Sequence, residues 1–177
     1  QNTHGRVLAP SNYTSNVNSS LGNWAVQEIV DQIDVTRNTI GADGNVHFSE
    51  RAFRHNWKGV RDALKLEYPM DALPPRYTWL DASIPPKPTL ATKPWSPSAF
   101  DMPWRLFTWE PRAGEQPHLY SLYTRYGTTW KLQVVSAETR KIWVSTENEL
   151  GQQLTGFAVG SVDRCGNESS KSTWPGQ

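Results

Sequence analysis

Five side chains near the start of this 177-residue chain follow short apolar stretches and carry groups that can contact a ligand. Amide, imidazole and hydroxyl groups hydrogen-bond to hydroxyl-bearing molecules, an aromatic ring can stack on them, and a carboxylate can take up a proton. The candidates are Asn12, Tyr13, His47, Ser49 and Glu50. No other carboxylate forms a credible pair with Glu50, so the sequence predicts binding contacts and no catalytic residue.

Each candidate also has a purely structural explanation. Ser49 can cap the helix that follows it, and His47 can be an interior histidine whose hydrogen bonds are satisfied. For Asn12 and Tyr13, a solvated loop rich in serine and asparagine is the favoured interpretation. Glu50 is favoured as an acidic residue in the first turn of a helix, where the helix dipole stabilises it.

Two predicted strand–helix pairs would hold these side chains. Arg6–Ala9 is an apolar run ended by a proline and predicts a buried strand, and Asn45–Ser49 predicts a second. Each is followed by apolar residues at helical spacing, namely Val26, Ile29, Val30 and Ile33, then Phe53, Trp57, Val60 and Leu64. Strand, helix, strand, helix with short connections predicts an α/β unit with a parallel sheet.

The second predicted strand alternates in polarity. His47 and Ser49 share one face, and Val46 and Phe48 share the other. We expect the apolar pair to pack on the helices and the polar pair to point toward the candidate site.

The composition changes after residue 70. A proline-rich joint is followed by β-prone segments separated by turn residues, namely Trp104–Trp109, Leu119–Tyr126, Thr129–Val135, Lys141–Thr146 and Thr155–Val162. Their spacing predicts an all-β sandwich of the immunoglobulin kind. The expected domains are residues 1–82 and 83–177.

Charge and cysteine content exclude several classes of function. The net charge is +1, with basic and acidic residues interspersed, so no basic field predicts nucleic-acid binding. Cys165 is the only cysteine, and the histidines lack metal-ligand spacing, so we expect neither a metal site nor a cofactor. No apolar run has the length of a membrane span.

Two motifs resemble known families. Phe157–Ser169, with the sequence FAVGSVDRCGNES, resembles the last strands of fibronectin type III domains attached to bacterial carbohydrate-active enzymes. Gly44–Ser49, Tyr68–Pro75 and the helix residues around Glu28 and Gln32 resemble the end of the glycosyl-hydrolase-like-10 family, whose members are predicted glycosidases with a (β/α)8 barrel.

This resemblance implies the last two βα units of a barrel, with Arg6–Ala9 as strand seven and Asn45–Ser49 as strand eight, followed by a fibronectin III-like sandwich. The chain would be a C-terminal, non-catalytic fragment of a secreted, periplasmic or cell-surface bacterial glycoside hydrolase. Glycosidases need two flanking carboxyl groups, and this chain lacks such a pair. Its partners would be a carbohydrate, the missing N-terminal part of the barrel, or a second copy meeting exposed barrel edges.

The nine tryptophans and six tyrosines leave two alternatives open. The sandwich can be a carbohydrate-binding module that contacts glycans through exposed aromatic rings. It can instead be a structural accessory domain whose aromatic residues fill the core. Exposed aromatic side chains would favour the first alternative, and buried ones would favour the second.

Overall fold

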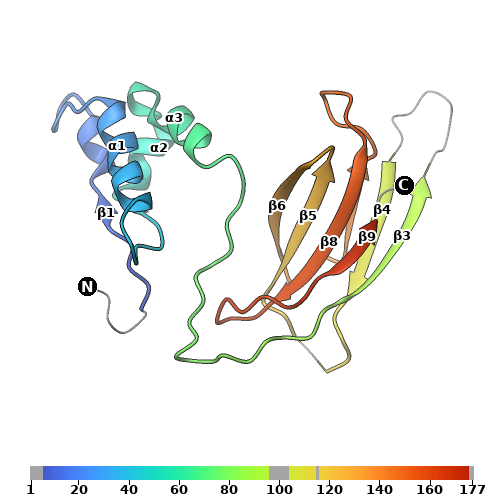
Figure 1. Cartoon of the computed structure of the whole chain (residues 1–177). Coiled ribbons are helices and arrows are strands. Elements are labelled where there is room, and N and C mark those ends of the chain that lie inside the picture. The colour runs from blue at the N-terminus through green and yellow to red at the C-terminus, as the bar shows by residue number, and fades with distance from the viewer. Residues whose placement is uncertain (1–5, 96–103, 115, 176–177) are drawn as a thin grey trace. The chain divides into compact units, whose positions relative to one another are not determined.

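A computed structural model of the chain describes residues 6–95, 104–114 and 116–175, and it divides into two compact units (Figure 1). The first unit is Gln1–Pro69 and the second is Met70–Gln177. The expected domain boundary lay after residue 82, whereas the structure divides the chain after Pro69. Each unit has its own hydrophobic core.

The first unit combines short helices with one pair of very short strands. Its strands β1 and β2 are parallel, with Ser11 beside Val46 and Asn12 beside His47. In chain order the elements are β1 (Ser11–Asn12), a 3-10 helix (Thr14–Val17), α1 (Val26–Arg37), β2 (Val46–His47), α2 (Glu50–Arg54), a second 3-10 helix (Trp57–Gly59) and α3 (Val60–Glu67).

The helices of this unit pack through the apolar positions that follow helical spacing. Ile29 and Ile33 lie one turn apart on α1 and are fully buried. They meet Val60 and Leu64, which are also one turn apart, on α3. Gly59 precedes α3 with a φ of +81°, a backbone conformation that favours glycine.

The second unit consists of two antiparallel sheets. One sheet has the order β3-β4-β7, from β3 (Thr89–Trp95), β4 (Trp104–Glu110) and β7 (Lys141–Ser145). The other has the order β6-β5-β8-β9, from β5 (Leu119–Tyr126), β6 (Thr129–Ser136), β8 (Leu154–Val162) and β9 (Ser172–Pro175). Such an arrangement is a β-sandwich with an apolar layer between the sheets.

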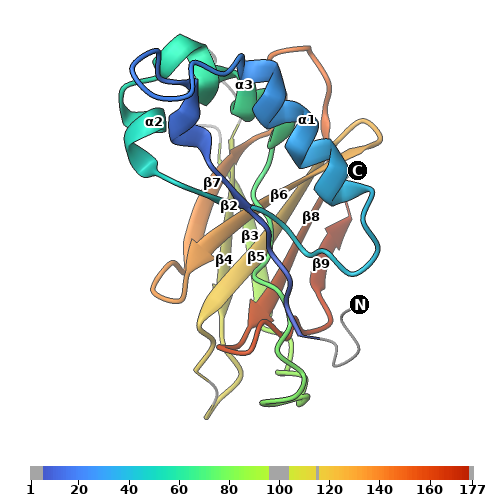
Figure 2. The same ribbon diagram turned by 90° about the vertical axis from the view of Figure 1, so that its left-hand side faces the viewer.

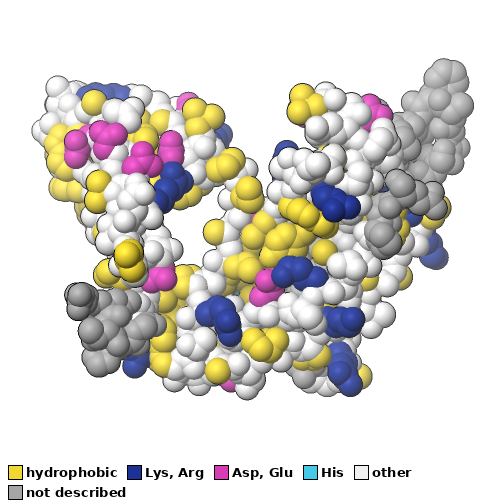
Figure 3. Space-filling view, viewed as in Figure 1, with side chains coloured by type: hydrophobic (Ala, Val, Ile, Leu, Met, Phe, Trp, Pro, Cys, Tyr) yellow, Lys and Arg dark blue, Asp and Glu magenta, His cyan; other side chains and the backbone are white. Residues whose placement is uncertain are grey.

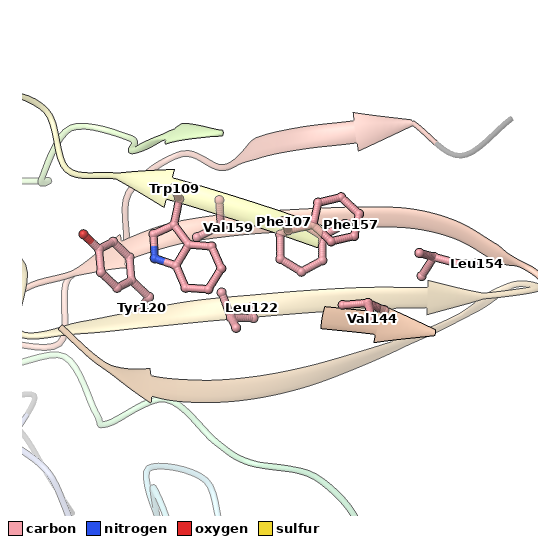
Figure 4. Close-up of a cluster of buried hydrophobic side chains, with 8 residues drawn as sticks. All are labelled: Phe107, Trp109, Tyr120, Leu122, Val144, Leu154, Phe157 and Val159. Carbon is pink, nitrogen blue, oxygen red and sulfur yellow. The ribbon is translucent and has the colours of Figure 1, made fainter. Parts of the chain in front are cut away.

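Aromatic rings make up much of that layer (Figure 4). Phe107 of β4 stacks on Phe157 of β8, with ring centroids 3.9 Å apart. Trp109 of β4 meets Tyr120 of β5 edge to face at 5.8 Å. These contacts join the two sheets, so the alternating inward residues of both sheets form one core.

The segment that precedes β3 is part of this unit. Arg76 donates two hydrogen bonds to Oδ1 of the buried Asn167, at 3.1 and 3.0 Å, and the backbone N–H of Tyr77 donates to the carbonyl of Cys165 at 2.7 Å. A Cβ atom on Gly166 would lie 2.5 Å from the carbonyl oxygen of Pro75. The proline-rich segment and the β8–β9 turn therefore fit closely together.

The prediction that the first part of the chain forms the end of a (β/α)8 barrel is wrong. The extended sheets are antiparallel, and the parallel pairing of the first unit spans only two residues in each strand. Residues 6–9 form no strand; Leu8 instead bonds to Asp43 through its N–H and its carbonyl oxygen, and its side chain is exposed. A parallel strand is normally buried on both faces, and this short pair is not.

Candidate functional site

The parallel pairing of β1 and β2 brings Asn12 and His47 together, with Asn12 in the short strand itself and not in a loop that follows a strand at residues 6–9. Asn12 is only 3% exposed. Its Nδ2 donates to Oε1 of Gln32 on α1 at 2.9 Å, and its buried Oδ1 has no hydrogen-bond partner among the described residues. The Asn12 amide is therefore held by Gln32, while its Oδ1 is closed off from solvent.

His47 is half-buried between the strands and the helices. A hydrogen bond of 2.9 Å joins its Nδ1 to the hydroxyl of Thr14, and its ring meets Phe53 edge-on at 5.5 Å. Its buried Nε2 has no hydrogen-bond partner in the described part of the chain. Burial lowers the pKa of His47, so the imidazole is neutral at pH 7.

Ser49 is fixed by a second serine. The two hydroxyl oxygens of Ser49 and Ser15 are 3.2 Å apart, and the N–H of Ser49 donates to Oγ of Ser15 at 3.1 Å. Ser49 occupies the position before α2, yet its side chain makes no capping hydrogen bond. Its contacts join the end of β2 to the 3-10 helix that follows β1.

The orientation of the second strand is opposite to the expected one. Val46 and Phe48 are 54% and 56% exposed, whereas His47 packs against the helices. The strands lie beneath the helices in Figure 2. Tyr13, which is 44% exposed, pairs with Phe48 at a ring-centroid distance of 5.4 Å. The outward side of the strand pair therefore presents two aromatic rings.

A groove of about 340 Å³ separates β1 from α1. Asn12 lines it, together with Glu28, Asp31 and Gln32 of α1. Gln32 connects two of these residues, because it accepts from Asn12 and donates to Glu28 at 2.9 Å. Sequence reasoning did not place these α1 side chains at the site, since their proximity depends on how α1 packs on β1.

Glu50 lies apart from these contacts as an exposed residue in the first turn of α2. The site as a whole offers hydrogen-bonding groups in a groove and, beside them, an exposed aromatic pair. Among the described residues, no group of three His, Cys, Asp or Glu side chains is arranged to hold a metal ion. None of the helices in the described ranges combines the length and apolar character of a membrane span.

Comparisons with known proteins give a weak likeness among solved structures. No family model matches the chain, and neither does any curated protein. Among solved structures, the glycoside hydrolase domain of Endo-D from Streptococcus pneumoniae R6 is similar over 53% of this chain, with 20% identity and a TM-score of 0.37. The match spans 15% of that protein's chain. A TM-score this low supports no conclusion about fold or activity.

Proposed function

We propose that this chain is the non-catalytic, glycan-contacting part of a glycoside-hydrolase-like protein. In its finer form the proposal assigns the chain to the glycosyl-hydrolase-like-10 type, with the second unit as a fibronectin type III-like accessory domain and a periplasmic, cell-surface or secreted bacterial location. The antiparallel orders β3-β4-β7 and β6-β5-β8-β9 are compatible with such a domain.

The exposed ring pair of Tyr13 and Phe48 is the observation that carries the proposal. The C–H face of a sugar ring is apolar and packs on an aromatic face, while its hydroxyl groups need hydrogen-bond partners. The neighbouring groove is lined by Asn12, Glu28 and Gln32, whose side chains carry polar groups that suit such hydroxyls. An aromatic surface beside polar groups suits a molecule that is apolar on its faces and polar around its edge.

Binding is tested by isothermal titration of the whole chain with four oligosaccharides: cellohexaose, xylohexaose, maltohexaose and chitohexaose. We expect one of them to bind, and the double variant Tyr13→Ala/Phe48→Ala to weaken that binding at least tenfold, about 1.4 kcal/mol. The control is Leu66→Ala, which removes another exposed apolar side chain of the same unit. Equal affinity in the double variant and the control would contradict the proposal, as would binding of none of the four.

The absence of catalysis is tested separately. We expect no release of reducing sugar from these oligosaccharides, because Glu28 and Asp31, the carboxylates that line the groove, both come from α1 and so do not flank a bond from two sides. Turnover that a single Asp or Glu substitution abolishes would show that this chain is itself a glycosidase.

A further inference from the structure

The outer face of the β6-β5-β8-β9 sheet carries an apolar hollow of about 360 Å³. Figure 3 shows hydrophobic side chains gathered on this face and bordered by charged ones. Five residues from four strands and the β8–β9 connection line the hollow: Tyr123, Trp130, Ala158, Lys171 and Thr173. Trp130 lies outside the sandwich core, and its side chain is 41% exposed.

The hollow follows from the small residues that β8 presents outward. A Cβ atom on Gly156 would lie 2.9 Å from the Trp130 ring, so glycine lets this ring reach across the sheet. At Gly160, a Cβ atom would lie 2.7 Å from Oγ of Ser121. The Trp130 ring thus covers Gly156, and the side chains of Ser121 and Glu168 cover Gly160. Ala158, between the two glycines, is left as the floor of the hollow.

The Trp130 ring, which forms the aromatic wall of the hollow, is held in place by the Arg125 side chain. The guanidinium carbon of Arg125 lies 5.0 Å from the centre of the Trp130 ring. Arg125 itself is fixed by two hydrogen bonds of 2.9 Å to Thr155, one to Oγ1 and one to the carbonyl oxygen. The ring is therefore positioned before any ligand arrives, which reduces the entropy lost on binding.

The charged groups on the opposite wall are paired with one another. The Glu168 carboxylate accepts hydrogen bonds from Ser121 at 2.6 Å, Tyr123 at 2.8 Å and Lys171 at 2.8 Å. The Lys171 ammonium also lies 4.8 Å from the centre of the Tyr123 ring. An anionic ligand would have to compete with Glu168 for Lys171, so these pairings favour a neutral ligand.

We infer that this hollow binds a neutral pyranose residue of a glycan, with one face of the sugar on the Trp130 ring. The inference rests on the proposed function for the class of ligand and adds a second site on a separate unit. The apolar faces of the sugar match Trp130 and Ala158. Its hydroxyl groups would face the rim of the hollow, where Lys171 is a lining residue and Glu168 bonds to Lys171 and Tyr123.

The test follows the tryptophan indole N–H signals of the 15N-labelled whole chain during titration with the same four oligosaccharides. Hexagalacturonate and AMP are the anionic and nucleobase probes. We expect a neutral oligosaccharide to shift the Trp130 signal, and Trp130→Ala to weaken its binding at least tenfold while Trp130→Phe retains part of the affinity. Trp143→Ala is the matched control, because Trp143 is 44% exposed on β7 of the other sheet.

A second variant leaves every lining residue in place. Gly156→Ala forces the Trp130 ring to move, so we expect weaker binding from this variant as well. Oligosaccharide binding that survives Trp130→Ala but is lost in Tyr13→Ala/Phe48→Ala would overturn this inference and leave the proposed function intact. Binding that is lost in Trp130→Ala but survives in Tyr13→Ala/Phe48→Ala would support the hollow as a glycan site and count against the site at Tyr13 and Phe48. Preferential binding of AMP or hexagalacturonate would also overturn the inference, as would no shift with any probe.

Discussion

His47 and Glu168 are half-buried titratable groups whose surroundings act on them in different ways. Burial alone lowers the pKa of His47, because the imidazolium loses hydration. Burial works to raise the pKa of Glu168, but hydrogen bonds from Lys171, Ser121 and Tyr123 outweigh it and hold that pKa below its usual value. Both groups therefore make the fold less stable toward acid, in different pH ranges.

His47 should destabilise the first unit in mild acid. The folded-state pKa is below the unfolded-state value of about 6.5, so the unfolded chain binds the proton first as the pH falls. The contribution of His47 to the free energy of unfolding is complete above about pH 6.5 and decreases as the pH falls toward the folded-state pKa. We expect His47→Gln to reduce this decrease in urea unfolding between pH 7.5 and 5, and the control Leu66→Ala, at an exposed position of the same unit, to leave it unchanged. An unchanged decrease in His47→Gln would contradict the assignment.

Gly160 should not accept a side chain. Because a Cβ atom there would lie 2.7 Å from Oγ of the buried Ser121, we expect Gly160→Ala to destabilise the sandwich by about 1–3 kcal/mol. Gly44→Ala is the control, since no atom lies within 4 Å of its added Cβ. The midpoints of thermal unfolding of the two variants are compared. Equal midpoints would show that Ser121 and its neighbours move aside for the added Cβ without loss of stability.

At the scale of elements, the sequence predicts the strands of the sandwich much better than those of the first unit. Leu119–Tyr126 is predicted with its observed bounds, and Lys141–Thr146 differs by one residue. These strands alternate in polarity because one face lies on a core and the other faces solvent. Strand β3 was not predicted, since Lys93 and Pro94 interrupt the pattern; a proline is tolerated there because β3 is an edge strand.

The candidate site was predictable only in part. The sequence predicts that the loop with Asn12 and the strand with His47 face the same site, but it places the first strand at residues 6–9, whereas the pairing forms at Ser11–Asn12. The direction of His47 does not, because it depends on Thr14 and on how the helices pack over the strand. The hollow on the sandwich was also missed, since the position of Trp130 depends on the distant Gly156.

The core of the sandwich should depend strongly on β8. Phe157 is fully buried and stacks on Phe107, so we expect Phe157→Ala to cost about 3–5 kcal/mol of unfolding free energy. The control is Lys141→Ala, at an exposed position of β7, which should change stability by no more than about 0.5 kcal/mol. Urea denaturation followed by tryptophan fluorescence measures both, and a cost below 1 kcal/mol for Phe157→Ala would contradict the observed core.

At the scale of the whole molecule, the second unit should need the segment before its first strand. Without Arg76, the buried amide of Asn167 loses two of its hydrogen bonds, at a cost of about 1–3 kcal/mol. We therefore expect residues 70–177 to fold alone and residues 83–177 to melt at least 4 °C lower. Arg76→Ala within residues 70–177 should reproduce part of the loss. Equal melting temperatures for the two lengths would show that residues 70–82 contribute no stability.

The same segment protects the sandwich from association between chains. Strand β6 pairs only with β5 in the described part of the chain, so its outer edge presents unpaired backbone groups. Asp71 occupies one of them, because its Oδ2 accepts from the N–H of Val134 at 2.8 Å. A charged side chain at a strand edge opposes pairing with another strand, because the charge would lose its hydration, and Asp71 also fills a hydrogen-bonding position. Forms of the protein that begin after Asp71 would therefore lose solubility during concentration and storage before any loss of secondary structure became visible.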